Sequence, residues 1–328
     1  MSSMSRQDIA AYALEAMTKA GADLASCSVT NSRKDEFNIE AGKFTLMRSL
    51  FNDSLSLKAI CGGRKGVTVV NKIDKDSVDN AVADCIALAK LATPDDAEDV
   101  AEKVENKSFD LTIGGSDMDK LFSETKSFLE QMGIEYPKIV LEGVVSEFNS
   151  AKTNYVNSKG VEFNSNKEYY NFDAMFTAKD GEKMSSFNSY GGTLSALDVP
   201  FIDMGMGRTL FAESVKSLDT RMVDEKFVGK VIVTPHCDDM IWGTILDCFL
   251  TDRSLVEGTS RWKDALGTIV ADKKLTMRLA PHHPGVVCGE RFTADGYESK
   301  DTDLIKTECL NLLHYRYTAR VKQETSVL

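Results

Sequence analysis

The most unusual local feature of the chain is a pair of adjacent histidines, His282 and His283, placed between two prolines. Two carboxylates, Asp295 and Glu298, follow shortly after them. Imidazole and carboxylate groups could together hold a metal ion or act as general acid and base. However, neighbouring side chains on an extended chain point to opposite faces, so two adjacent imidazoles rarely reach one ion. We therefore predict a loop role for this region, with a metal-dependent hydrolase site as the alternative.

A second group of possible ligands begins at His236 and includes the carboxylates Asp238 and Asp239. It follows an apolar run at residues 230–234 that has the composition of a strand. Carboxylates at the start of a helix more often accept hydrogen bonds from free backbone N–H groups than bind a metal. The sequence therefore predicts a strand over 230–234 and then a helix that Asp238 or Asp239 caps and that runs to about residue 250.

Composition and charge exclude several other functions. The formal net charge of −11 and the pI near 5.0 give a field that repels phosphate backbones, so nucleic acid is not an expected partner. The seven cysteines form no CxxC pair in a chain too large to need disulfides, which indicates a reducing cytoplasm. The sequence shows neither an export signal nor the run of about 18 apolar residues that a membrane span requires. The glycine-rich run at 62–66 lacks the spacing of a phosphate-binding loop.

Hydrophobic periodicity predicts the elements that must position these residues. Apolar residues recur at helical spacing over residues 6–20, 76–91, 117–131 and 205–219. Short alternating runs between residues 28 and 70, separated by turn residues such as Asn52-Asp53, indicate an antiparallel meander. Longer alternating runs between residues 138 and 190 contain strong hairpin signals at 157–160 and 180–181.

These patterns predict an α+β fold in three parts. An N-terminal helix-plus-antiparallel-meander unit spans residues 1–106 and ends in an acidic connector with little apolar content. A central antiparallel β unit with helices spans 107–228, and a C-terminal β-rich domain spans 229–328. The three units need not behave as independent domains.

The order of these segments resembles the TldD/PmbA family of peptidase-associated proteins, also known as modulators of DNA gyrase. The resemblance spans roughly residues 6–322 and is carried by weak motifs in a consistent order, namely Ala20–Asp23, Gly62–Gly66, Tyr155–Val161, Ser214–Arg221, Leu304–Lys306 and Tyr317–Arg320. Members of the family usually continue through a further glycine-rich stretch after a segment like the last of these, whereas this chain ends at Leu328.

The resemblance also locates where a metal site would be. In the TldD branch, a strand similar to Val231–Thr234 leads into a helix with the motif His-Glu-x-x-x-His, in which two imidazoles hold zinc and the glutamate activates water. Counted from that strand, the motif falls on Gly243, Thr244 and Cys248. Glycine has no ligating side chain, threonine is no carboxylate base, and one cysteine is far short of the three protein ligands of a catalytic zinc. We expect these positions to be vestigial and Cys248 to be a small buried hydrophobe.

The resemblance therefore implies the metal-free, TldE/PmbA-like branch. It implies a non-metal subunit of a cytoplasmic metallopeptidase complex that acts on unfolded peptides or peptide precursors. Such a subunit binds no cofactor itself and relies on the zinc of a TldD-type partner, although a homodimer is also possible. Two alternatives stay open at this point: a self-sufficient metal-dependent hydrolase that uses the His282/His283 region, and a non-enzymatic homo-oligomeric binding protein.

Overall fold

A long, curved β-sheet forms the body of the molecule in the computed structural model, which describes residues 4–220, 222 and 225–311. Its strands are β1 (Leu24–Glu40), β2 (Lys43–Cys61), β3 (Arg64–Val70), β4 (Lys107–Leu111), β5 (Ile139–Asn157), β6 (Glu162–Asp180), β7 (Lys183–Met184) and β8 (Asn188–Leu194). The order is β3-β2-β1-β5-β6-β4, with β7 and β8 also paired to β6. Neighbours are antiparallel except β4 and β6, which are parallel. The predicted α+β class is confirmed.

The meander of the first unit and the hairpin of the second unit share this one sheet. Strand β1 pairs with β2 on one side and with β5 on the other, from Ser26 to Glu40. The expected break at Asn52-Asp53 is wrong, because both residues lie within β2, opposite Ser32 and Asn31. The Asn31 amide donates a hydrogen bond of 2.5 Å to Asp53 Oδ1, so the polar pair is satisfied across the two strands without a turn.

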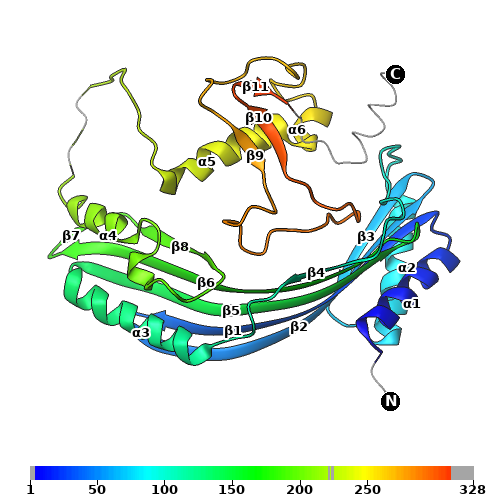
Figure 1. The fold of residues 1–328 in the computed structure, drawn as a ribbon, viewed down its shortest axis with the longest axis horizontal. Helices are drawn as coiled ribbons and strands as arrows, with labels where there is room; N and C mark the ends of the chain where they lie inside the picture. Colours follow the sequence, from blue (N-terminus) through cyan, green and yellow to red (C-terminus); the bar gives the residue numbers. More distant parts are fainter. Residues whose placement is uncertain (1–3, 221, 223–224, 312–328) are drawn as a thin grey trace.

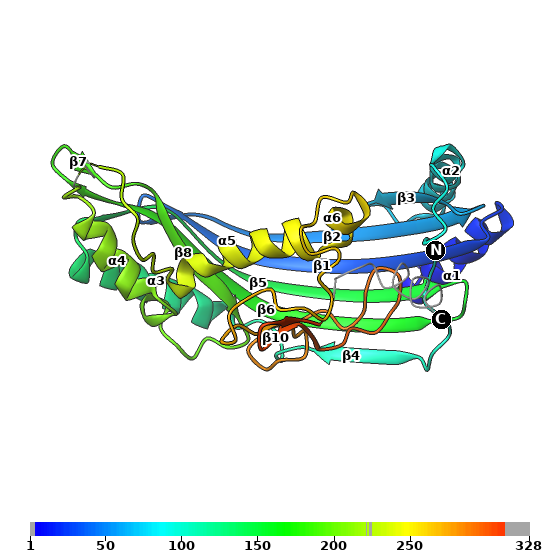
Figure 2. The ribbon, with the colours of Figure 1, turned by 90° about the horizontal axis from the view of Figure 1, so that it is seen from above.

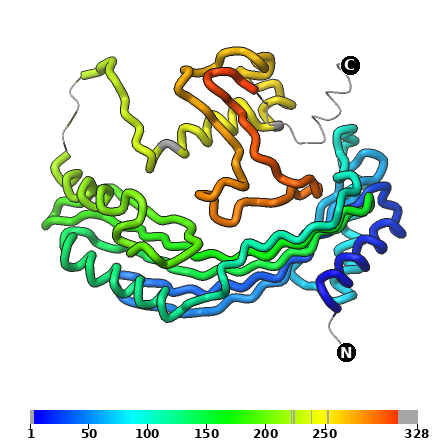
Figure 3. The backbone as a smooth tube through the Cα atoms, in the orientation of Figure 1, coloured from blue at the N-terminus to red at the C-terminus, as the bar shows by residue number. Residues whose placement is uncertain are grey.

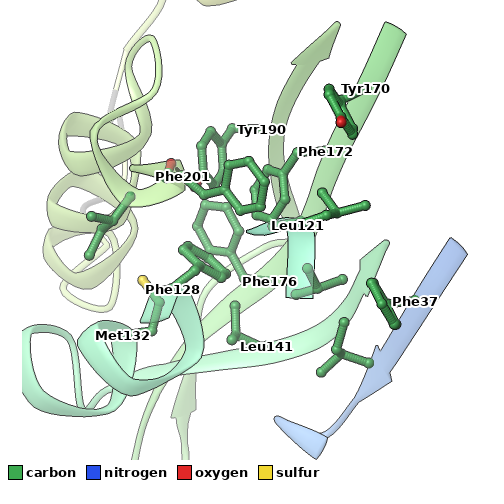
Figure 4. Close-up of a cluster of buried hydrophobic side chains, with 14 of the residues drawn as sticks. Phe37, Leu121, Phe128, Met132, Leu141, Tyr170, Phe172, Phe176, Tyr190 and Phe201 are labelled. Atoms are coloured by element: carbon green, nitrogen blue, oxygen red, sulfur yellow. Dashed lines mark hydrogen bonds between the residues drawn. The ribbon is translucent and has the colours of Figure 1, made fainter. Parts of the chain in front are cut away.

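Helices cover the two ends of the sheet (Figure 1). Helices α1 (Arg6–Lys19) and α2 (Lys75–Leu91) pack against one end, where their apolar faces meet β1 and β2 in a buried cluster. Helices α3 (Met118–Glu135) and α4 (Gly207–Lys216) and the turn η1 (Phe201–Asp203) lie at the other end. There Phe128, Phe172, Phe176 and Tyr190 form the aromatic centre of the largest core (Figure 4).

The chain from residue 226 to residue 311 lies over the hollow side of the sheet (Figures 2 and 3). It contains α5 (Pro235–Ile245), the π-helical turn η2 (Leu246–Leu250), α6 (Asp252–Val256) and three short strands, β9 (Met277–Leu279), β10 (Thr302–Lys306) and β11 (Cys309–Leu310). A small core of Leu250, Leu255, Leu304, Ile305 and Leu310 holds this region together. In the part of this region that the structure describes, helix contributes more residues than strand. The segment 317–320 lies outside that part.

The predicted strand at 230–234 is wrong. These residues have no regular secondary structure, and the side chains of Val231 and Ile232 are 84% and 89% exposed. A strand needs a partner to satisfy its backbone groups, and no described strand lies beside this segment. Among the described residues, no helix has the length and apolar character that a membrane span needs.

Candidate functional site

A polar cavity of about 600 Å3 lies between the hollow side of the sheet and the segment 290–295. Side chains alternate between the two faces of a strand, so every second residue along one part of each central strand faces this space. The floor therefore consists mainly of side chains with hydroxyl or ammonium groups, namely Ser26, Ser28, Thr30, Ser56, Lys58, Lys65, Thr153, Tyr155, Ser165 and Lys167. The sequence analysis missed this floor, although the period-two spacing of Ser26, Ser28 and Thr30 was a signal for it.

The wall of the cavity contains a network of buried charges. The Glu98 carboxylate forms an ion pair of 3.0 Å with Lys58 Nζ and accepts a hydrogen bond from Lys65 Nζ at 2.6 Å. Lys58 Nζ also lies 2.7 Å from Asp295 Oδ1, and its side chain is only 12% exposed. Two ammonium groups thus face two carboxylates, which leaves this network close to neutral.

The segment 290–298 is fixed over the sheet by contacts with the first half of the chain. The Ala101 N–H donates to the Asp295 carbonyl oxygen at 2.8 Å, and Lys107 forms an ion pair of 2.6 Å with Glu298. Gly296, whose φ is +88°, packs so tightly that a Cβ there would lie 2.6 Å from Tyr155 Oη. Burial, aided by the nearby Asp295 carboxylate, raises the pKa of the Tyr155 phenol, so Tyr155 is neutral at physiological pH.

The structure separates the candidate residues around the histidine pair. Residues 281–284 form turns, as expected for a loop. His282 Nδ1 lies 3.2 Å from Asp301 Oδ1, whereas His283 Nδ1 accepts the Gly285 N–H at 3.0 Å. The carboxylates of Asp295 and Glu298 pair with lysines of the sheet rather than with these imidazoles.

His236 lies at the start of α5 and is half-buried. The expected cap at Asp238 or Asp239 is wrong, because α5 begins at Pro235 and both aspartates lie inside it. Proline is favoured at the first helical position, where its missing N–H has no partner to lose. The Asp239 carboxylate instead accepts the N–H of its neighbour Met240 at 2.8 Å.

Residues 228–326 match the family model described as the PmbA/TldA metallopeptidase C-terminal domain. The metalloprotease PmbA homolog of Haemophilus influenzae is 23% identical over 321 residues, which cover 91% of this chain and 67% of that protein. The chain is similar to proteins of the TldD/PmbA family.

Solved structures of three other proteins share the fold of this chain. The match to TldE from Thermococcus kodakarensis has a TM-score of 0.74 at 15% identity. It covers 96% of this chain and 72% of the TldE chain. Two crystal structures of proteins described as modulators of DNA gyrase also match. The Thermotoga maritima protein has a TM-score of 0.73 at 13% identity, and the Bacteroides thetaiotaomicron protein has a TM-score of 0.79 at 17% identity. These cover 98% and 99% of this chain, and 73% and 75% of their own chains.

The positions where the TldD branch would place its zinc motif lie on α5 and η2. Gly243 has no side chain, and the Thr244 hydroxyl donates to the Met240 carbonyl of its own helix at 2.7 Å. Cys248 is exposed, so the expected buried role is wrong. The reason is that α5 and η2 turn Leu246, Phe249 and Leu250, rather than Cys248, toward the small C-terminal core.

These residues do not fit a catalytic zinc. One thiol is available where three protein ligands are needed. More broadly, no group of three or more His, Cys, Asp or Glu residues in the part of the chain that is described is arranged to hold a metal ion.

Proposed function

We propose that this chain is the non-metal subunit of a cytoplasmic metallopeptidase complex that acts on unfolded peptides or peptide precursors. Its similarity to a metalloprotease, and the match of its C-terminal third to a metallopeptidase domain, support the class of reaction. The single observation that carries the subunit role is the replacement of the zinc motif by Gly243, Thr244 and Cys248 in a helix that otherwise occupies the expected place. In this proposal the catalytic ion belongs to a TldD-type partner, and this chain supplies scaffold and peptide-binding surface.

The free edge of β2 is the surface that best fits an extended peptide. Strand β3 pairs with β2 only from Leu55 to Cys61, so the segment 43–54 has β1 on one side and no described strand on the other. An unpaired strand edge presents N–H and C=O groups that an incoming peptide can pair with, whatever its sequence. Such an edge suits substrates that are unfolded rather than defined by a motif.

An apolar groove of about 450 Å3 accompanies this edge. The Phe44 and Phe122 rings lie 4.8 Å apart between centroids, and Phe37 and Phe122 lie 5.6 Å apart. Further along the edge, the side chains of Met47 and Phe51 are 68% and 74% exposed. Exposed apolar side chains beside free backbone groups are the features that strand addition uses, because the side chains gain burial while the backbone gains hydrogen bonds.

Mixing experiments test the subunit role. The purified chain alone is expected to show no chelator-sensitive peptidase activity and to gain it on addition of a TldD-type partner. Chelator-sensitive cleavage by the chain alone, with stoichiometric zinc or manganese, would favour the self-sufficient hydrolase at the His282/His283 region instead. A chain that purifies as a homo-oligomer and activates no partner would favour the non-enzymatic binding protein.

Variants of the free edge test the peptide surface. Met47→Lys combined with Phe51→Lys is expected to weaken the binding of an unfolded peptide to the reconstituted complex by about tenfold or more, because two apolar contacts are lost. Val69→Lys is the matched control. The Val69 side chain is 63% exposed, similar to those of Met47 and Phe51, but it lies on β3, outside the free segment 43–54. Equal loss of binding in both variants would place the peptide elsewhere.

A further inference from the structure

The polar cavity carries cations that its own network does not neutralise. Four of its lining residues are cationic, in a chain whose net charge is −11. Lys58 and Lys65 are matched by Glu98 and Asp295. Within the described residues, Lys167 and Arg291 form no ion pair, and Arg291 donates to the Pro281 carbonyl oxygen, which leaves most of its guanidinium donors free. Neither of these two cations is therefore paired with a carboxylate in the described part of the chain.

These two cations line the same cavity although they come from distant parts of the chain. Lys167 is on β6, and Arg291 is in the segment above it. The Cys288 thiol, which donates to the Glu168 carbonyl at 3.3 Å, lies near both. Burial raises the pKa of this thiol, and the positive charges of Lys167 and Arg291 act against the rise. Both cations thus lie within electrostatic range of one thiol and line one cavity.

Ser165 adds an unsatisfied hydroxyl to the same site. Its side chain lies two residues before Lys167 on the same face of β6, and the residue is 4% exposed. The Ser165 Oγ lines the cavity and has no hydrogen-bond partner among the described residues. Buried hydroxyls without a partner are rare and costly, so an unpaired one beside two free cations points to a polar ligand.

The remaining lining sets the size and character of that ligand. Apolar surface comes from Phe292 and Val67, and Glu290 is an exposed carboxylate with no ion pair in the described part of the chain. The volume falls within the range of small-molecule sites. A site that is lined by unpaired cations, a free carboxylate and apolar side chains suits a small zwitterion with apolar side chains.

We propose that this cavity binds a short peptide through its free carboxylate, with Lys167, Arg291 and Ser165 as the recognising groups. The carboxylate accepts hydrogen bonds from the ammonium, the guanidinium and the hydroxyl, and planar guanidinium groups are suited to bidentate contact with it. The proposal requires neither the partner subunit nor a metal. Failure of this site would therefore leave the proposed subunit role untouched, and the reverse also holds.

Calorimetric titration of the purified chain tests the proposal with three probes: trialanine, trialanine amide and inorganic phosphate. Trialanine is expected to bind, and its amide to bind about tenfold more weakly or not at all, because the charge-assisted hydrogen bonds are lost. Equal binding of the acid and the amide, or no binding of either, would overturn the proposal. Phosphate that binds as tightly as trialanine and displaces it would show a free-anion site instead of a peptide site.

Substitutions locate the binding. Lys167→Gln and Arg291→Gln are each expected to weaken trialanine binding by about tenfold, and Ser165→Ala by less. Lys152→Gln is the matched control, because Lys152 is exposed on β5 and points away from the face that carries Thr153 and Tyr155. Lys167 has no ion pair to lose, so its variant is expected to keep the unfolding midpoint of the parent chain. Unchanged binding in both Lys167→Gln and Arg291→Gln would refute the assignment.

Discussion

At the residue scale, charged side chains link neighbouring strands on the hollow side of the sheet, and their protonation affects the stability of the fold. Glu147 on β5 is mostly buried and lies 2.8 Å from Lys34 Nζ on β1. Burial alone would raise the pKa of this carboxyl, but the hydrogen bonds from Lys34, Asn149 and Asn171 outweigh burial and lower the pKa below its ordinary 4.5. The charged form of Glu147 is therefore favoured by folding.

This shift predicts how acid weakens the fold. Because the folded pKa lies below the unfolded one, Glu147 stabilises the protein above about pH 4.5, and this contribution is lost as the pH falls through the folded pKa. Glu147→Gln is expected to lower the free energy of unfolding by about 1 kcal/mol at pH 7 and to flatten its decline in acid. Urea denaturation between pH 7 and pH 3 measures both effects.

Glu130→Gln provides the control for this prediction. Glu130 is an exposed residue of α3 whose carboxylate lies 3.8 Å from Lys126, and exposed pairs of this kind contribute little. An equal change in the pH profile of both variants would mean that general charge, rather than the pairing of Glu147, sets the acid sensitivity.

Residue types were readable from the sequence, but their partners were not. Asp295 was a candidate because of its type, yet its partner Lys58 is 237 residues away in the chain. Such an ion pair arises only when the segment 290–298 packs over the sheet, and nothing in the local pattern records that packing. For the same reason, the cavity floor becomes visible only once β1, β2, β5 and β6 lie side by side.

At the element scale, local signals predicted helices well and strands less well. The starts of α2 and α3, at Lys75 and Met118, each lie within one residue of the predicted helical ranges. Asp74 and Asp117 cap them by accepting the backbone N–H groups of Ser77 and Lys120, which are near in sequence. Strands depend on partners elsewhere in the chain. Polar residues within β2 therefore suggested a turn, but the pairing of β2 with β1 continues through them. Apolar residues at 230–234 suggested a strand, but no described strand pairs with this segment.

The contact between α2 and β3 predicts a sharp dependence on one glycine. A Cβ at Gly66 would lie 2.0 Å from the Cys85 carbonyl oxygen and 2.6 Å from the Ala89 nitrogen, both backbone atoms of α2. Gly66→Ala must push the helix away from the strand and is expected to cost about 3 kcal/mol or more of unfolding free energy. Urea denaturation of the variant measures this cost.

Gly133→Ala makes the same chemical change in an open environment. Gly133 is an exposed residue in α3, and a Cβ there would meet no atom within 4 Å. Alanine is the better helix former, so this variant is expected to gain about 0.5–1 kcal/mol. A loss in Gly133→Ala similar to that in Gly66→Ala would show that packing against α2 is not the cause.

At the scale of the whole molecule, the sheet and the C-terminal region are unequal in stability. The sheet carries two large apolar cores, one at each end, whereas the region after residue 225 has a core of only five buried residues in its described part. Few buried apolar groups mean a small hydrophobic contribution to folding. The C-terminal region therefore depends on its contacts with the sheet, such as Lys58 with Asp295 and Lys107 with Glu298.

Two optical probes report separately on the unfolding of these two parts. Both tryptophans, Trp242 and Trp262, lie in the C-terminal region, so fluorescence reports on that region. The sheet dominates the strand signal in far-ultraviolet circular dichroism. In urea, the tryptophan fluorescence is expected to change at a lower concentration than the strand signal. Asp295→Asn combined with Glu298→Gln should widen this gap by lowering the fluorescence midpoint alone, since only contacts between the two parts are lost. Coincident transitions that shift together in the variant would instead mean that the weak core is stabilised cooperatively by the sheet, and that the cavity between them opens only on global unfolding.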